Sequence, residues 1–370
     1  MKVLFLVNGD PRSAAAERAR SLSRSFPRDW RVAYEYRPSS KVRGIVRFIR
    51  TACSFRPTVI YVVETAYTGV VAVCFTRLIT RCRWVLDTGD VAYALARSTG
   101  IYNIAQLCLI WAVEEIGIRT ADIVVVRGSF HRDLLTSRGV AAVEFIPDGI
   151  SSEALAPSPQ PQPRQEFSGG NALVLGLIGS MIWSPRYQMC YGWDVVEAMP
   201  LLSDLPVVAL LVGDGDGRAR LEERARELGV DRKIEFAGRR EGEELQHFLQ
   251  KMHVCISTQS NDVVGMVRTT GKLPLYLAAE RCVVATDVGE ASRVLPGIGY
   301  LLPYRGVKDP MHPARLAHLV RQLACGEADL HLGRGFRRET ALREFSYEIL
   351  GQKVKDICMR LSNGSNSGDN

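Results

Sequence analysis

The chain has 370 residues, with 47 Lys and Arg against 40 Asp and Glu, and it is long enough for two domains with large buried cores. Its nine cysteines are scattered and include no C-x-x-C pair, which argues against a disulfide framework or a zinc site and favours a reducing, cytoplasmic setting. The longest apolar stretches, near 65–79 and 101–113, are shorter than about 20 residues and contain polar ones, so no membrane-spanning helix is predicted.

The excess positive charge lies in the first half of the chain. Residues 1–150 contain 21 Lys and Arg against 13 Asp and Glu, whereas residues 151–370 contain 26 against 27. A surplus confined to one half predicts that this half meets an anionic partner. No helix-turn-helix, zinc-finger or RNA-recognition pattern accompanies it, so nucleic acid is not the predicted partner.

Short apolar runs alternate with helix-like stretches along residues 1–155. The first run, Val3–Val7, is too short for the core of a signal peptide and is predicted to be a buried strand. Further strands are predicted at 32–36, 59–63, 84–86, 123–126 and 143–146, and helices at 13–26, 41–54 and 129–137. This alternation predicts a parallel, doubly wound sheet.

A proline-rich linker at 156–170 follows this half. Four prolines fall within seven positions, from Pro157 to Pro163, and neither a helix nor a central strand accommodates such a run. Residues 171–345 repeat the alternation, with strands predicted at 173–178, 207–212, 234–236, 254–257 and 282–286, and helices at 194–202, 218–228, 243–252, 273–279 and 313–324. An amphipathic helix at 346–361 and a disordered polar tail at 362–370 are predicted to follow.

The segment from Arg268 to Lys272, R-T-T-G-K, has the composition of an anion site. It follows a predicted strand and loop and precedes a predicted helix. Backbone N–H groups, the helix dipole and two cations favour an anion at such a place. One dipole contact contributes only about 0.3–1 kcal/mol, so the cations must contribute more. We therefore predict a phosphate site for a nucleotide sugar; the alternative is that both cations are ordinary exposed residues.

A second glycine-rich loop, G-D-G-D-G at 213–217, follows a predicted strand and opens a helix. It fails as a nicotinamide or flavin fingerprint because its third glycine comes too early and no acid ends the next strand. A plain tight turn is the alternative. The loop begins a longer run, V-G-D-G-D-G-R-A-R-L-E-E-R-A-R-E-L-G-V-D-R-K-I-E-F-A-G, which resembles the donor-domain segment of the family 4 glycosyltransferases.

Other segments resemble motifs of the same family. They are P-D-G-I at 147–150, the run that begins G-S-M-I-W-S-P-R at Gly179, and T-G-K-L-P-L-Y-L-A-A-E-R-C-V-V-A-T-D-V-G-E at 270–290. The similarity covers most of residues 140–361. It implies an α/β GT-B fold with two doubly wound Rossmann-like domains facing a cleft: an acceptor domain at 1–155, a nucleotide-sugar domain at 171–345, and a helix at 346–361 that crosses back to the first.

The resemblance implies transfer of a sugar from a nucleotide-sugar donor to the hydroxyl of a glycan, a lipid-linked saccharide or a small molecule. It implies retention of the anomeric configuration, no metal and no further cofactor. Asp90 is the candidate to accept or position the acceptor proton, with an Asx turn as the alternative, and Gly9 and Asp10 would approach the acceptor. The predicted donor-binding residues are Gly179, Ser180, Arg186, Gly213, Asp214, Gly215, Gly238, Arg239, Arg268, Thr269, Thr270, Gly271, Lys272, Asp287 and Glu290.

The sequence departs from the family at its paired glutamates. Leu275 occupies the position of the second glutamate, and the first falls near Val267. Ser180 and Tyr191 replace an arginine and a lysine, and Arg186 is the candidate to supply the missing charge. Two alternatives therefore stay open: a non-catalytic homologue that binds nucleotide or a protein partner, and a sugar-nucleotide epimerase.

One predicted helix, at 41–54, combines basic and apolar residues. Its cations Lys41, Arg43, Arg47 and Arg50 alternate with Ile45, Val46, Phe48 and Ile49. The pattern fits a solvated face, and it equally fits a helix lying on an anionic membrane, here the inner face of the membrane.

Overall fold

The computed structural model describes residues 1–80, 82–151 and 172–364, and these form two compact units. Unit 1 contains Met1–Ser151, Val267–Thr269 and the chain from Glu344 onward. Of the described residues, unit 2 contains 172–266 and Thr270–Arg343. The predicted linker at 156–170 and the predicted tail beyond residue 364 lie outside the described residues. Among the described helices, none has the length and apolar composition needed to cross a membrane.

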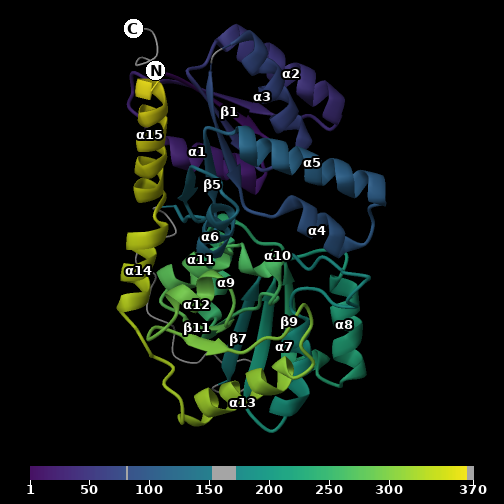
Figure 1. Cartoon of the computed structure of the whole chain (residues 1–370). Helices are drawn as coiled ribbons and strands as arrows, with labels where there is room; N and C mark the ends of the chain where they lie inside the picture. Colours follow the sequence, from purple (N-terminus) through teal and green to yellow (C-terminus); the bar gives the residue numbers. More distant parts are fainter. Residues whose placement is uncertain (81, 152–171, 365–370) are drawn as a thin grey trace. The chain divides into compact units, whose positions relative to one another are not determined.

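Unit 1 is built on a parallel sheet of six strands in the order β2-β1-β3-β4-β5-β6 (Figure 1). The strands are β1 (Lys2–Val7), β2 (Arg31–Tyr36), β3 (Val59–Val63), β4 (Arg83–Thr88), β5 (Ile123–Val126) and β6 (Val143–Phe145). The helices are α1 (Ala14–Ser23), α2 (Lys41–Phe55), α3 (Tyr67–Ile79), α4 (Ala92–Thr99), α5 (Ile104–Thr120), α6 (Ser129–Ser137) and α15 (Tyr347–Gly364). The strand order reverses between β1 and β3, and ligands of doubly wound sheets collect beyond the carboxyl ends at such a point.

The two faces of this sheet are covered by different helices. Alternate residues of a strand point to opposite faces. In β1, Val3 and Phe5 pack with α1 and α15, whereas Leu4 and Leu6 pack with α2, α3 and α5. The helix at the end of the chain thus completes the core of unit 1, as the resemblance implies. It continues to Gly364, so the predicted disorder of residues 362–364 is wrong.

The sequence prediction assigned no helix to α3, α4 or α5. The α3 segment is largely apolar, and α5 is apolar well beyond the face that it buries. A helix is recognised from one sequence by a repeating apolar stripe. These two helices show no such stripe, so their type could not be deduced from periodicity.

Unit 2 contains a second parallel six-stranded sheet, in the order β12-β11-β10-β7-β8-β9. Its strands are β7 (Leu173–Ile178), β8 (Val207–Val212), β9 (Ile234–Gly238), β10 (Val254–Ser257), β11 (Cys282–Thr286) and β12 (Tyr300–Leu302). Its helices are α7 (Trp193–Ala198) with the 3-10 turn Met199–Leu202, α8 (Arg218–Glu227), α9 (Gly242–Lys251), α10 (Val263–Met266), α11 (Lys272–Ala278), α12 (Glu290–Val294) and α13 (His312–Cys325). A further helix, α14 (Phe336–Phe345), precedes α15.

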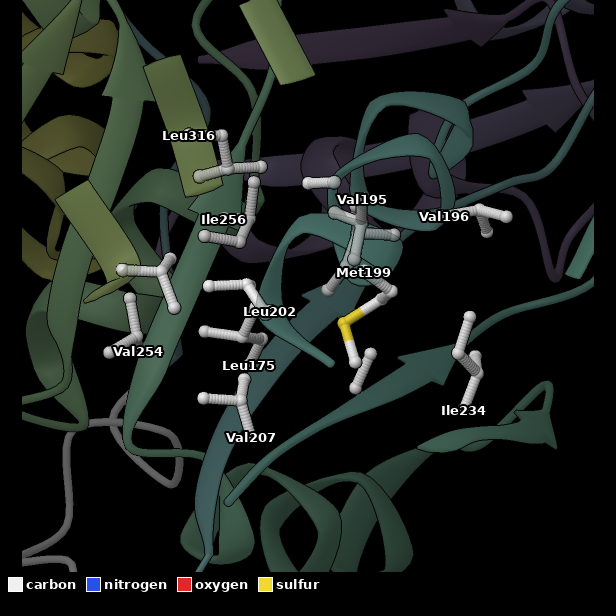
Figure 2. Packing of buried hydrophobic residues seen from close by; sticks show 14 of the residues in the cluster. Leu175, Val195, Val196, Met199, Leu202, Val207, Ile234, Val254, Ile256 and Leu316 are labelled. Atoms are coloured by element: carbon white, nitrogen blue, oxygen red, sulfur yellow. The ribbon is translucent and has the colours of Figure 1, made fainter. Parts of the chain in front are cut away.

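One face of the second sheet packs against α7, α8 and α13. Figure 2 shows Met199 and Leu202 beside the strand residues Leu175 and Val207 in this core. All of these side chains are at most 1% exposed. The core fixes β7 and β8 against the helix layer, so the loops that follow both strands emerge from a rigid base.

A buried carboxyl group lies at the edge of this core. Asp194 in α7 is 5% exposed, and the Tyr304 hydroxyl donates a hydrogen bond to it at 3.4 Å. Burial raises the pKa of Asp194 to about 7. A carboxyl whose folded pKa exceeds its unfolded pKa destabilises the fold as pH rises from the unfolded to the folded value.

We therefore expect Asp194→Asn to stabilise the protein more at pH 8 than at pH 5. The amide stays neutral, whereas the aspartate ionises in the unfolded chain at a lower pH than in its buried place. Since one pKa unit corresponds to about 1.4 kcal/mol, the gain in the free energy of unfolding at pH 8 should exceed the gain at pH 5 by about 2–3 kcal/mol. Urea unfolding of both proteins at the two pH values measures it. An equal change at both would contradict the assignment.

Candidate functional site

A cavity of about 550 Å³ opens at the carboxyl ends of β7, β8 and β9 in unit 2. Three successive loops line it: Ile178–Ser180, Val212–Gly215 and Arg239–Glu241. Of the predicted donor-binding residues, the structure gathers six here: Gly179, Ser180, Gly213, Asp214, Gly215 and Arg239. A pocket of this size at this edge of a doubly wound sheet is typical of a small-ligand site.

Close backbone packing explains why glycine stands at the centre of this cavity. Gly213 has φ +149°, and a Cβ atom there would lie 1.9 Å from the Gly179 carbonyl oxygen. A Cβ on Gly215 would lie 2.4 Å from the Met181 carbonyl oxygen. The loops after β7 and β8 therefore touch through bare backbone, and a ligand can approach that backbone closely.

Lys272 borders the same cavity. Its Nζ lies 3.7 Å from the centre of the Tyr191 ring, and its Cε would be 3.1 Å from a Cβ on Gly179. Tyr191 is itself held by a hydrogen bond of 3.1 Å from its hydroxyl to the Ile256 carbonyl. The hydroxyl of the nearby Thr270 is buried without a hydrogen-bond partner in the protein. The lysine is thus positioned by an aromatic face beside a glycine-lined, open cavity.

The structure divides the predicted segment Arg268–Lys272 between the two units. Arg268 and Thr269 belong to unit 1, and Thr270, Gly271 and Lys272 to unit 2. In unit 1 the Arg268 guanidinium donates to the Asp90 carboxylate, and the Thr269 hydroxyl donates to the Arg127 carbonyl. Arg268 thus has an acidic partner in this structure, and the prediction that Arg268 and Lys272 together hold a phosphate stays a prediction. The helix α11 has only seven residues, so its dipole is small.

The remaining predicted donor-binding residues lie outside the group that lines the cavity. Arg186 is exposed in the turn closed by Ser184 and Met189, with its guanidinium 5.6 Å from the Tyr187 ring centre. Gly238 ends β9, one residue before the lining loop. Asp287 is exposed, whereas Glu290 is 1% exposed and paired with Arg293 at 2.7 Å. Glu290 is thus held within α12.

The three predicted catalytic residues occupy loops at the carboxyl edge of the first sheet. Asp10 is exposed and accepts a hydrogen bond from the Arg12 backbone N–H at 2.8 Å. Gly9 lies against Ser13: a Cβ on Gly9 would lie 2.3 Å from the Ser13 Oγ. Asp90 is partly buried and ion-paired with Arg268. In this arrangement Asp90 is a paired carboxylate.

A buried charge cluster in unit 1 was missed by the sequence analysis. Asp87, at the end of β4, accepts hydrogen bonds from Arg18 Nε and the Tyr61 hydroxyl, both at 2.8 Å, and from Arg127 Nε at 3.2 Å. Burial favours a higher pKa of Asp87, but the two guanidinium groups outweigh it and the pKa is lowered. The sequence showed Asp87 next to Asp90 in one loop, yet nothing local distinguished the buried carboxylate from the partly exposed one.

Glu64 adds a strained residue to this cluster. It follows β3 with φ +72°, and it pairs with Arg127 at 2.7 Å. Burial raises the pKa of Glu64 although Arg127 acts against it. A non-glycine residue in left-handed backbone costs about 1–3 kcal/mol and concentrates at functional sites.

Polar atoms without protein partners gather beside Glu64, where the strand order of the first sheet reverses. The Asn8 Oδ1 and the hydroxyls of Thr65 and Thr68 are buried with no hydrogen-bond partner. Asn8 Nδ2 donates to the Glu64 carbonyl at 2.6 Å, and a Cβ on Gly69 would lie 2.8 Å from that nitrogen, so Asn8 lies between Glu64 and α3. Such groups are normally satisfied by water or a ligand. Asn8 and Thr68 are therefore further candidates for contact with a polar ligand.

Metal-binding side chains do not converge anywhere in the described ranges: no group of three or more His, Cys, Asp or Glu residues there is placed to hold an ion.

Solved structures with the same architecture cover the whole of this chain. Sucrose-phosphate synthase from Thermosynechococcus elongatus matches with a TM-score of 0.76 and 16% identity, covering 98% of this chain and all of that one. Anabaena HepE in complex with UDP-glucose matches with a TM-score of 0.75 and 15% identity, covering 97% and 100%. A glycosyltransferase from Rickettsia africae matches with a TM-score of 0.70 and 13% identity, covering 97% and 98%. The predicted GT-B fold is confirmed.

The family comparison adds an assignment for the second half of the chain. Residues 172–324 match the family model described as Glycosyl transferases group 1, so this part of the chain is similar to that family. The sequence-based recognition of a glycosyltransferase of this type is confirmed, and the match supports a transferase. Comparison with curated protein sequences gave no match.

Proposed function

We propose that this chain transfers a sugar from a nucleotide-sugar donor, bound at the cavity of unit 2, to a hydroxyl acceptor. The observation that carries the proposal is the glycine-lined cavity with Lys272 at its border. The family match supports it. So do two HepE structures, which contain UDP with glucose in one and UDP-glucose in the other.

In this proposal the donor diphosphate lies over the loops after β7 and β8. Breaking the anomeric bond places negative charge on the leaving diphosphate, and preorganised donors aimed at that charge lower the barrier. Lys272 supplies the cation, while Gly179, Gly213 and Gly215 let the phosphate oxygens approach backbone N–H groups. We propose that no metal is required and that the anomeric configuration is retained, as the resemblance implies.

On this proposal, Lys272→Ala weakens the binding of a nucleoside diphosphate. Loss of this cation beside the cavity should reduce the affinity about tenfold or more, equivalent to about 1.4 kcal/mol. Lys272→Arg should retain part of it, since the charge remains. Titration calorimetry with UDP, GDP and ADP measures the effect and identifies the base.

The matched control is Lys251→Ala, a lysine of the same unit that lies against Phe248. It should bind like the parent. Arg268→Ala, tested in parallel, should leave the diphosphate affinity unchanged because its guanidinium is paired with Asp90. If Lys272→Ala and the parent bind with equal affinity, the phosphate assignment is wrong.

A second candidate is a homologue that binds nucleotide without transferring sugar. It is favoured by the missing glutamates: Val267 is fully buried and Leu275 is apolar, so neither position supplies a carboxylate. The purified protein with a panel of sugar nucleotides and acceptors separates the two. Nucleoside diphosphate binding without turnover supports the second candidate, and release of the epimerised sugar without acceptor would identify an epimerase.

We also propose that unit 1 contacts an anionic membrane surface. The support is α2, whose Lys41, Arg43, Arg47 and Arg50 are exposed and which contains no acidic residue. Each such cation near an anionic leaflet contributes about 1 kcal/mol. An acceptor carried by a lipid would then lie at the same surface as the enzyme.

A further inference from the structure

The first half of α5 is an exposed helix of apolar residues. The sequence from 98 to 113 contains no charged residue, yet Ile104 is 79% exposed and Leu109 and Trp111 are more than half exposed. A capping box formed by Asn103 and Gln106 fixes the start of the helix. The apolar surface is therefore presented by a regular helix with a defined start rather than by a loose loop.

The neighbouring helices add exposed apolar residues and positive charge to the same layer. α3 packs against both α5 and α2 on the same face of the sheet, as Figure 1 shows. It exposes Phe75 and Leu78, with Leu78 82% exposed. α2 exposes Val42 and Val46 between its arginines. Arg77 in the last turn of α3 donates a hydrogen bond to the carbonyl of Thr120 at the C-terminal end of α5. The exposed end of α3 and the first half of α5 are therefore two separate apolar surfaces of one helix layer, in which α2 is the basic helix. Exposed apolar patches of this extent mark interaction sites.

We infer that the first half of α5 inserts into the headgroup–acyl boundary of an anionic bilayer while the arginines of α2 meet the lipid phosphates. Charge complementarity decides in favour of lipid. α2 carries four cations and no acid, and of these cations Arg47 is paired with Glu35 of β2 at 2.6 Å. The apolar surface of α5 has no charged residue of its own on 98–113. A protein partner is normally met by an apolar centre surrounded by polar groups. Amphipathic surfaces with aromatic and aliphatic anchors beside Lys and Arg lie in membrane interfaces.

This inference divides the proposed membrane binding into two contributions. The contacts of the arginines should depend on the salt concentration, whereas the insertion of the apolar side chains should not. Contacts between arginines and phosphates are screened by salt, whereas burial of apolar side chains is not. It does not rest on sugar transfer, since the elements involved lie in unit 1 and the proposed donor cavity lies in unit 2.

Vesicle flotation of the full chain tests the inference. The vesicles are phosphatidylcholine alone or mixed with phosphatidylglycerol, each at low and at high salt. We expect the parent to float with anionic vesicles and to keep part of that binding at high salt. The double substitution Leu109→Ser with Trp111→Ser should lower the vesicle affinity at least tenfold and abolish the salt-resistant part. Arg43→Gln with Arg50→Gln should abolish only the salt-sensitive part.

A matched control and a direct readout complete the experiment. Leu201→Ser with Met311→Ser removes two exposed apolar side chains of unit 2 and should leave flotation unchanged. Acyl-brominated lipid should quench a part of the tryptophan fluorescence that is missing in Trp111→Leu. Each variant must retain the melting temperature and the UDP affinity of the parent. If the parent itself does not bind UDP, the proposed donor site is wrong and the membrane inference is unaffected.

Three results would overturn the inference. The parent does not float with anionic vesicles, or the α5 variant floats as well as the parent. In the third result, the parent is a dimer in solution and the α5 substitutions dissociate it. The exposed apolar surface of α5 would then be a contact with a second copy of the chain.

Discussion

Replacing Arg18 by Met should lower the free energy of unfolding by about 3–5 kcal/mol, the cost of leaving a buried charge without its partner. Arg18 is 1% exposed, and besides Asp87 it donates to the carbonyls of Pro147 and Ile146, both at 2.8 Å. The substitution removes these bonds together with the charge. Urea unfolding at pH 7 measures the loss. The matched control is Arg360→Met, whose exposed pair with Glu144 should contribute less than about 1 kcal/mol.

The same variant should also change the response to acid. In the parent, the pKa of Asp87 is lowered, so its contribution to stability is present above the unfolded pKa and is lost as pH falls through the lower folded value. Without Arg18 one of the two guanidinium groups that lower this pKa is missing. Arg18→Met should therefore lose less stability than the parent between pH 5 and pH 2. A parallel pH dependence in both proteins would show that the cluster is not coupled in this way.

Gly213→Ala should disable the proposed donor site. The new Cβ would lie 1.9 Å from the Gly179 carbonyl oxygen, and the backbone at φ +149° disfavours any side chain. Because the contact is with backbone rather than with a flexible side chain, the loops after β7 and β8 must separate. We expect the affinity for UDP to fall at least tenfold, and the free energy of unfolding to fall by about 1–3 kcal/mol. Calorimetry and urea unfolding measure the two effects.

The control for this substitution is Gly229→Ala. Gly229 lies in the same unit at φ +68°, and a Cβ there has no neighbour within 4 Å. It should cost about 1–2 kcal/mol for the left-handed backbone and leave UDP binding intact. Equal losses of affinity in the two variants would show that general destabilisation, and not the closed loop contact, explains the effect.

Local patterns in the sequence were sufficient for the strands and for the glycine-rich part of the site. A buried parallel strand is a short run of β-branched and aliphatic residues, and nearly every such run was located, for example Val59–Val63 and Leu173–Ile178. The loops after β7 and β8 were located because their glycines follow those runs directly. Both kinds of pattern are encoded within a few neighbouring residues.

Interactions between distant residues could not be predicted in this way. Arg18 lies in the predicted helix at 13–26, yet its partner Asp87 is 69 residues away. Arg268 was expected to hold a phosphate, but its partner Asp90 is 178 residues away. The charge of a side chain is visible in the sequence, whereas the group that neutralises it depends on the assembled fold.

The packing of α15 onto the first sheet has a consequence for the order of events during synthesis. Leu350, Val354 and Ile357 fill a core whose other members are encoded before residue 147. On a ribosome, that core must wait while some two hundred intervening residues emerge. The residues of unit 2 are close together in the chain, so unit 2 can complete its fold before unit 1 does, although it is synthesised later. Until α15 is synthesised, one face of the first sheet is exposed and available to a chaperone.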